Sequence, residues 1–215
     1  MDECSKSKRI WTELERSVFV GAGIDIGCGP DPVAPDCRRY YKDHGDANRI
    51  TEFVDRQFDY VYSSHCLEHM HNPRDAVQQW WKLVKDGGHL FFAVPDEDLY
   101  EQGVFPSRFN SDHKATFTIS KTASWCPKSV NVLDLAMSLP RGRIVSIALQ
   151  DQGYDRRLLV HGDPKAIPIR PTLQSYKYIL NCIPGIRRLY NPPAVIDQTM
   201  SGALAQIQCI VQKSL

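Results

Sequence analysis

The chain has 215 residues, of which 42% are hydrophobic and 24% charged, and its formal net charge is +1. This balance is typical of one folded domain over residues 1–215, and it gives no support for nucleic acid or a membrane surface as a partner. Seven cysteines are scattered without a C-x-x-C pair. That pattern argues against a disulfide framework and a zinc site, and it favours a cytoplasmic location.

The first half of the chain alternates strand and helix patterns, as in a parallel sheet. A helix is predicted to begin at Pro73, because Asn72 is a favourable N-cap and proline suits the first helical position. Gly87 and Gly88 are expected to turn this helix into the next strand. Strands are predicted within residues 18–27 and at residues 38–41, 58–63 and 89–94.

The second half is less regular. Two long irregular segments, at about residues 95–128 and 151–200, are expected to be ordered insertions that cover the active site, because long loops in compact domains are usually functional. Regular elements are predicted at residues 129–139 (helix), 143–149 (strand), 173–182 (helix) and 203–212 (closing strand).

The strongest local signal is GIDIGCGPDP at residues 23–32. Gly27 and Gly29 let a ligand approach the backbone at the carboxyl end of a strand, where parallel sheets bind ligands. The loop is not the dinucleotide motif G-x-G-x-x-G, because Asp31 and Pro32 stand where the helix would start. Asp25 inside an apolar strand indicates a cationic amino-acid moiety or a water as its partner. The alternative is a tight corner in which Asp25 bonds local amides.

Two further pieces follow at intervals that suit the same strand edge. Asp46 can accept the amino proton of an adenine, and the amide of Ala47 can donate to the ring, although an Asx turn explains the same residues. After the strand at 58–63, the side chains of His65, Glu68 and His69 are expected to converge. Glu68 and His69 alone are too few for a metal site. A ring that packs on a ligand and a ring that bonds a backbone carbonyl are the more ordinary roles for the two histidines.

Taken together, these pieces and K-D-G-G-H at residues 85–89 resemble class I S-adenosylmethionine-dependent methyltransferases in order and spacing, over residues 18–96. The resemblance implies an α/β fold, a Rossmann-like three-layer sandwich whose mostly parallel sheet has an antiparallel closing strand. It also implies S-adenosylmethionine as the cofactor. The cofactor residues that it implies are Asp25, Gly27, Cys28 and Gly29 for the methionine part, Asp46 and Ala47 for the adenine, and Ser64, His65 and Leu67 along the cofactor.

One position departs from that family. An acid commonly ends the second strand and binds the ribose hydroxyls, but Tyr41 occupies this place. Asp43 is the expected substitute.

The acceptor site is expected in the segment after residue 94, which follows a strand end and overhangs the same cleft. His113 is the predicted general base, because its ordinary pKa lies near neutrality, and Asp112 is predicted to orient it or to contact the acceptor. Arg108, Trp125 and Glu68 are expected to bind the acceptor. No metal is expected, because the adjacent side chains of residues 96–98 point in different directions.

The sequence therefore predicts a methyltransferase for a small polar acceptor, without a nucleic-acid or membrane partner and with a homodimer possible. Residues 95–118 loosely resemble a subgroup associated with surface polysaccharides or secondary metabolites, which suggests O-methylation of a sugar or another hydroxylated molecule. One alternative is a catalytically weak or inactive binding protein of the same fold. A nucleic-acid methyltransferase is disfavoured by the near-zero net charge. It is also disfavoured because no motif of the Asn/Asp-Pro-Pro-Tyr type follows the strand at residues 58–63; Asn-Pro-Pro at residues 191–193 comes too late and lacks the aromatic residue.

Overall fold

The computed structural model describes residues 3–162 and 195–215, and the helix predicted at residues 173–182 lies outside the described residues. The main feature is a six-stranded sheet with strand order β2-β1-β3-β4-β8-β7. Its strands are β1 (Gly23–Ile26), β2 (Arg38–Tyr40), β3 (Phe58–Ser64), β4 (Val84–Pro95), β7 (Gly142–Gln150) and β8 (Gln206–Lys213).

The strand directions confirm the predicted sheet. β1 pairs in parallel with β2 and β3, β3 pairs in parallel with β4, and β8 is antiparallel to both of its neighbours. Ile26 at the end of β1 lies opposite Tyr40 and Ser63. The loops that follow β1, β2 and β3 therefore leave the sheet at one edge, and this shared edge positions the site described below.

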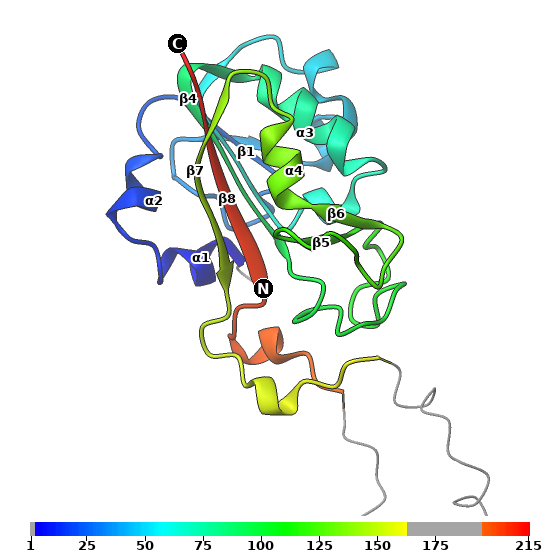
Figure 1. The fold of residues 1–215 in the computed structure, drawn as a ribbon. Helices are drawn as coiled ribbons and strands as arrows, with labels where there is room; N and C mark the ends of the chain where they lie inside the picture. The colour runs from blue at the N-terminus through cyan, green and yellow to red at the C-terminus, as the bar shows by residue number, and fades with distance from the viewer. Residues whose placement is uncertain (1–2, 163–194) are drawn as a thin grey trace, which may run out of the picture.

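Helices cover both faces of the sheet, which makes three layers (Figure 1). One face carries α1 (Glu3–Lys8) and α2 (Glu13–Ser17), and the other carries α3 (Pro73–Lys82) and α4 (Val132–Met137). The larger apolar core lies on the α3 face and includes the buried indoles of Trp80 and Trp81. A smaller, aromatic core lies on the α1 face, where Trp11 packs 5.3 Å from Phe91 between ring centroids.

The helix α3 begins as predicted, because the Asn72 side chain accepts a hydrogen bond from the amide of Arg74, and Pro73 is the first helical residue. The role predicted for Gly87 and Gly88 is wrong. The helix ends at Lys82, and both glycines lie inside β4, where the pairing with β3 shifts register after Val84. Gly87 has a φ of +79°, so these residues form a bulge rather than a helix cap.

The connections that surround the site are short and contain little helix. Residues 27–37, all of them described, form no helix between β1 and β2. Between β2 and β3 the chain makes only the 3-10 helices η1 (Lys42–His44) and η2 (Ala47–Glu52).

Residues 95–128, which we call the cover segment, are ordered around one buried acid. Glu97 is fully buried and accepts hydrogen bonds from Lys121 and from the hydroxyls of Thr116, Ser124 and Ser129. Pairing of β5 (Thr116–Thr118) with β6 (Ser129–Asn131) extends this arrangement. The helix predicted at 129–139 therefore begins only at residue 132, because its first three residues are recruited into β6.

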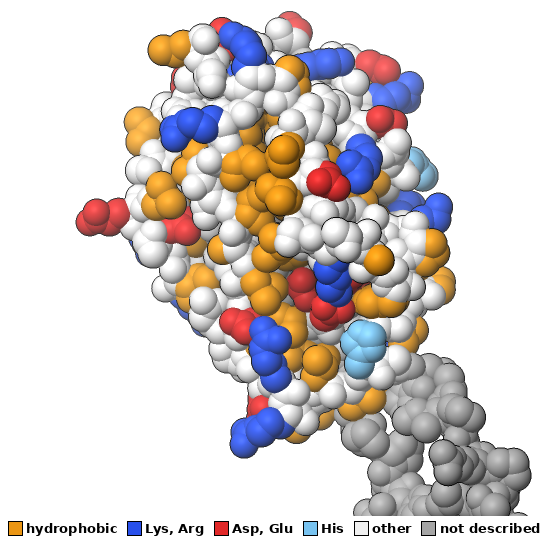
Figure 2. Space-filling view, in the orientation of Figure 1, with side chains coloured by type: hydrophobic (Ala, Val, Ile, Leu, Met, Phe, Trp, Pro, Cys, Tyr) orange, Lys and Arg blue, Asp and Glu red, His pale blue; other side chains and the backbone are white. Residues whose placement is uncertain are grey.

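The strand β7 forms one edge of the sheet, and its side chains are half-buried along most of its length. Figure 2 shows hydrophobic side chains gathered in the middle of this face, over β7 and α4. None of the described helices has the length and apolar character that crossing a membrane requires.

Candidate active site

Two cavities meet at the edge of the sheet where β1, β2 and β3 end. The larger has a volume of about 730 Å³ and is lined by the loops after β2 and β3, including Tyr41, Asp46, Ala47 and His69. The smaller has a volume of about 180 Å³ and lies over the glycine loop. Gly27 and His65 line both cavities, so the two spaces form one elongated site.

The smaller cavity has an acidic wall. Asp25, Asp31 and, from α1, Glu3 line it. Asp31 fastens α1 to the glycine loop, because its carboxylate accepts hydrogen bonds from the amide of Ser5 at 2.7 Å and from the Ser5 hydroxyl at 2.6 Å. The sequence did not predict this contribution of α1, since nothing in its short polar pattern indicates a binding element.

Asp25 is the buried acid of this wall, with 1% of its surface exposed. Its Oδ2 accepts a hydrogen bond from the amide of Val33 at 2.6 Å, as the tight-corner alternative requires. Its Oδ1 is buried and has no hydrogen-bond partner among the described residues. Burial raises the pKa of this carboxyl to about 7. An unsatisfied carboxylate oxygen on a small cavity suits a cationic ligand group.

Gly27 keeps the junction of the two cavities open. Its φ is +80°, and its amide donates to the Tyr40 carbonyl at 2.8 Å. A Cβ atom at this position would lie only 2.7 Å from both Cβ and Sγ of Cys66. The corner is therefore bare backbone, as the glycine pattern predicts, and no side chain fits there.

The loop at residues 45–48 lies against the larger cavity. The Asp46 carboxylate accepts hydrogen bonds from the amide of Asn48 at 2.9 Å and from its side chain at 2.7 Å, which is an Asx turn. These hydrogen bonds hold the pKa of Asp46 below its usual value. The indole of Trp80 donates to the carbonyl of Ala47 at 2.9 Å and so fixes the loop on α3.

His65 and Glu68 form a buried ion pair beneath the junction. His65 Nδ1 lies 3.3 Å from Glu68 Oε1, and its Nε2 lies 2.8 Å from the side-chain oxygen of Gln206. Burial lowers the pKa of His65, but contact with Glu68 outweighs it and raises the pKa to about 9. Burial alone would raise the pKa of Glu68, whereas His65 holds it below its usual value. Both groups are therefore charged at neutral pH.

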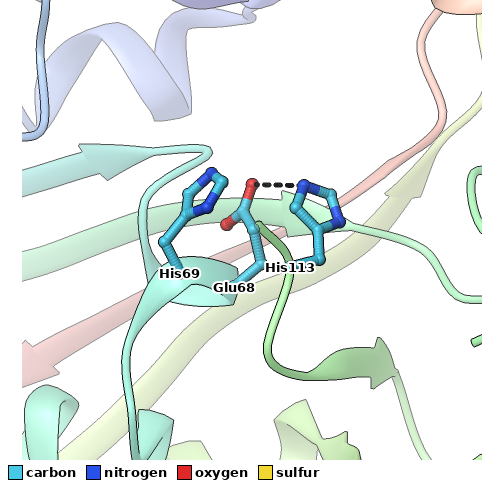
Figure 3. Close-up of side chains that lie close together, drawn as sticks. All are labelled: Glu68, His69 and His113. Carbon is cyan, nitrogen blue, oxygen red and sulfur yellow. Dashed lines mark ion pairs between the residues drawn. The ribbon is translucent and has the colours of Figure 1, made fainter. Parts of the chain in front are cut away.

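Glu68 also belongs to a cluster with His69 and His113 (Figure 3). His113 Nε2 faces Glu68 Oε1 at 3.9 Å, and the two histidine rings lie 5.1 Å apart between centroids. Glu68 and His113 are buried, whereas His69 is half-buried and lines the larger cavity. The cluster therefore opens on the site through His69.

Six predicted site residues line neither cavity: Asp43, Leu67, Glu68, Arg108, His113 and Trp125. Asp43, the predicted ribose ligand, is exposed on η1 and does not line the larger cavity, whereas its neighbours Tyr41 and Lys42 do. Leu67 belongs to the larger core, and the adjacent Cys66 lines the cavity. Arg108 and Trp125 make hydrogen bonds away from the cavities. Arg108 donates to the Gly162 carbonyl, and Trp125 donates to Asp98 within the cover segment.

The predicted pair of His113 and Asp112 is also corrected. His113 does not line either cavity, and the carboxylate that orients it belongs to Glu101, whose Oε1 lies 2.6 Å from His113 Nδ1. Asp112 lines the larger cavity, and its carbonyl lies 3.4 Å from His69 Nδ1. Glu101 is one of several acids in the cover segment, and only the fold brings it to His113.

Comparison with known proteins identifies the family. A family model described as a methyltransferase domain matches residues 8–127, more than half of the chain. The chain therefore belongs to this family of methyltransferase domains.

Relatives and solved structures agree with this assignment. Two curated proteins, both named ubiquinone biosynthesis O-methyltransferase, are 36% (Pectobacterium carotovorum) and 34% (Cronobacter sakazakii) identical to the chain over 80 residues. Each match covers 34% of this chain and 32% of the relative, so the matched part spans about a third of the relatives' length. The structure of the plantazolicin methyltransferase BamL with S-adenosylhomocysteine is similar in fold, with a TM-score of 0.50 and 13% identity over 100% of this chain and 86% of that one.

Proposed function

We propose that this methyltransferase methylates a hydroxyl group of a small molecule, a sugar or a secondary metabolite. The observation that carries the proposal is the cluster of Glu68, His69 and His113, which borders the cofactor cavity. A hydroxyl acceptor must lose its proton during transfer, whereas a group that is already nucleophilic needs only alignment. A buried carboxylate beside two histidines, of which His69 lines the cavity wall, suits the first task.

The proposed methyl donor is S-adenosylmethionine, and we place this cofactor across the two joined cavities. In the smaller one, Asp25 pairs with the cationic amino group, while the loop from Gly27 to Gly29, including Cys28, and the side chain of Ser64 line the methionine part. In the larger one, Asp46 and Ala47 contact the adenine. His65 lies where the two parts join. The unpaired Oδ1 of Asp25 and the bare backbone at Gly27 support this placement.

The bound cofactor supplies an electrophilic methyl group, which bonds to the acceptor oxygen as the carbon–sulfur bond breaks and sulfur keeps the electron pair. The protein's own residues align the acceptor and take up its proton. Asp112 and Lys114 bring the cover segment to the wall of the larger cavity, next to His69. This wall is therefore the proposed acceptor side, with Glu68 behind it.

The named relatives support a hydroxyl acceptor, because both are called O-methyltransferases. The net charge of +1 offers no excess of basic residues for a phosphate backbone, so the proposed acceptor is a small molecule rather than nucleic acid. The assay that tests the proposal measures transfer of labelled methyl from S-adenosylmethionine to panels of phenols, sugars and amines. Transfer to amines with none to hydroxyls would overturn it.

Replacing His69 by asparagine is expected to lower kcat by about 10²–10⁴-fold, the usual contribution of a proton-transfer group. Binding of S-adenosylhomocysteine should change little, because His69 belongs to the wall away from the glycine loop. The matched control is His71→Asn, since His71 is exposed and lines neither cavity. Steady-state kinetics and calorimetry on both variants separate the two effects. Equal loss of binding and turnover in His69→Asn would contradict this role.

The affinity for S-adenosylhomocysteine is expected to rise with pH between about 5.5 and 7.5, by up to roughly tenfold per pH unit. The free protein holds Asp25 protonated below its pKa of about 7, and the bound amino group needs the ionised form. Binding must therefore release a proton at low pH, and the affinity levels off above the pKa. Among the charged neighbours of this carboxyl, Lys8 and Arg39 lower its pKa, whereas Asp31 raises it.

Calorimetry at a series of pH values, in buffers of different ionisation enthalpy, measures both the affinity and the released proton. Asp25→Asn removes the titrating group at nearly constant shape, so its affinity should be weak and independent of pH over this range. A wild-type affinity that falls as pH rises, or an unchanged slope in Asp25→Asn, would refute the assignment.

A further inference from the structure

We propose that Glu68, His69 and His113 bind one divalent transition-metal ion at the wall of the cofactor cavity. One ligand atom from each of the three residues can be chosen so that all three lie within 4.8 Å of one another. The binding of the ion follows from these contacts, whereas its catalytic role rests on the proposed O-methyl transfer. The sequence predicted no metal because Glu68 and His69 lacked a third ligand, and the fold supplies His113 from the cover segment.

The carboxylate of Glu68 is the first argument. Only 1% of its surface is exposed, and although Oε1 is paired with His65, Oε2 has no hydrogen-bond partner in the described parts of the chain. Its ion-pair contacts with His65 and His113 both involve Oε1, which leaves Oε2 without a partner. Buried carboxylate oxygens are normally paired or bound to metal, because leaving them bare costs free energy.

The support of His113 is the second argument. Glu101, itself 1% exposed, holds His113 Nδ1 at 2.6 Å, so Nε2 is left facing Glu68. Metal-binding histidines commonly donate their other ring nitrogen to a carboxylate in this way, which fixes the tautomer and the ring orientation.

The backbone holds the two contributing segments together. Lys114 donates its amide to the Glu68 carbonyl at 2.7 Å and its ammonium to the His69 carbonyl at 2.9 Å. Ligand atoms around a metal at about 2.1 Å stand roughly 3.0–3.5 Å apart, so the site closes by a small movement. The His69 ring can make this movement, because it is half-buried and is held, among the described residues, only by a weak hydrogen bond to the Asp112 carbonyl.

The ligand types select the metal. Two imidazoles and one carboxylate suit Zn²⁺, Co²⁺ or Fe²⁺, whereas Mg²⁺ and Ca²⁺ prefer oxygen ligands. Because three protein ligands leave positions open, and His69 borders the larger cavity, the acceptor hydroxyl can occupy one of them. Coordination lowers the pKa of a bound hydroxyl, so its proton leaves to water and the metal holds the oxygen ready. When the metal is bound, His69 is one of its ligands and does not itself take up the proton of the acceptor.

The test uses the full chain after treatment with EDTA, without cofactor or acceptor. Calorimetry with Zn²⁺ and visible absorption with Co²⁺ are expected to give one bound ion per chain. His69→Asn and Glu68→Gln should each weaken binding at least 100-fold, while His71→Asn should bind as the wild type does. Binding of S-adenosylhomocysteine by the two ligand variants shows that they are folded.

Absence of Co²⁺ absorption bands in the wild type, or equal Zn²⁺ affinity in wild type and His69→Asn, would overturn the metal site. A separate assay of methyl transfer distinguishes the two proposals. Transfer that persists unchanged in metal-free protein would remove the metal's role and leave the O-methyltransferase proposal standing. Metal binding without methyl transfer to any hydroxyl would leave the metal site standing and overturn the O-methyltransferase proposal.

Discussion

Gly27→Ala is expected to weaken binding of S-adenosylhomocysteine at least 100-fold. The new Cβ would lie 2.7 Å from the Cys66 side chain, at the point where the two cavities meet. Its backbone φ of +80° adds a cost of roughly 1–2 kcal/mol for any residue with a Cβ. A 100-fold loss corresponds to about 2.7 kcal/mol, which a displaced loop that blocks the cofactor readily exceeds.

Gly202→Ala is the matched control. Gly202 has a φ of +94°, but a Cβ there meets nothing within 4 Å. This variant carries the same conformational cost without the steric conflict, so it should lose stability and keep its affinity. Calorimetric titration of both variants makes the comparison. Wild-type affinity in Gly27→Ala would show that the cofactor does not lie against this corner.

Glu97→Ala is expected to lower the free energy of unfolding by about 3–5 kcal/mol, because the buried carboxylate accepts hydrogen bonds from four groups and each such bond contributes roughly 1 kcal/mol. The substitution removes the acceptor of Lys121, of two hydroxyls in the cover segment and of the Ser129 hydroxyl on β6. Domains of this kind are stable by only about 5–15 kcal/mol, so the loss is a large part of the total. Urea denaturation followed by far-UV circular dichroism measures it.

Asp98→Asn is the control for this prediction, because Asp98 also contacts Lys121 but is about a third exposed. An exposed pair contributes at most about 1 kcal/mol, so this variant should remain close to the wild type. A loss below 1 kcal/mol in Glu97→Ala would mean that the cover segment does not depend on its buried acid.

Local sequence pattern predicted the half of the site that lies on the strand ends. The apolar run before Gly27 and the polar run after Ser63 fix where β1 and β3 stop, and parallel pairing then brings Asp25 and His65 to one edge. These residues needed no knowledge of distant contacts. The closing strand was also predicted from the apolar residues that recur through residues 203–211, while its antiparallel direction was implied by the family resemblance.

The other half depends on contacts between segments far apart in the chain. His113 meets Glu68 only because Glu97 and the β5–β6 pairing set the path of the cover segment. The contribution of α1 depends on Asp31, which binds Ser5 across the glycine loop. The direction of the Asp43 side chain could not be predicted for a different reason. Asp43 lies on η1, which is a single turn, and a single turn gives no periodicity from which to predict where a side chain points.

The absence of a helix between β1 and β2 decides which charge this site selects. A helix that starts after a glycine loop presents aligned amides and a partial positive charge, the arrangement that holds pyrophosphate in nucleotide-binding sheets. Here the loop is followed by irregular chain, and Glu3, Asp25 and Asp31 line the small cavity instead. A dinucleotide or nucleoside triphosphate would meet repulsion at this wall, whereas a positively charged sulfonium compound is attracted to it.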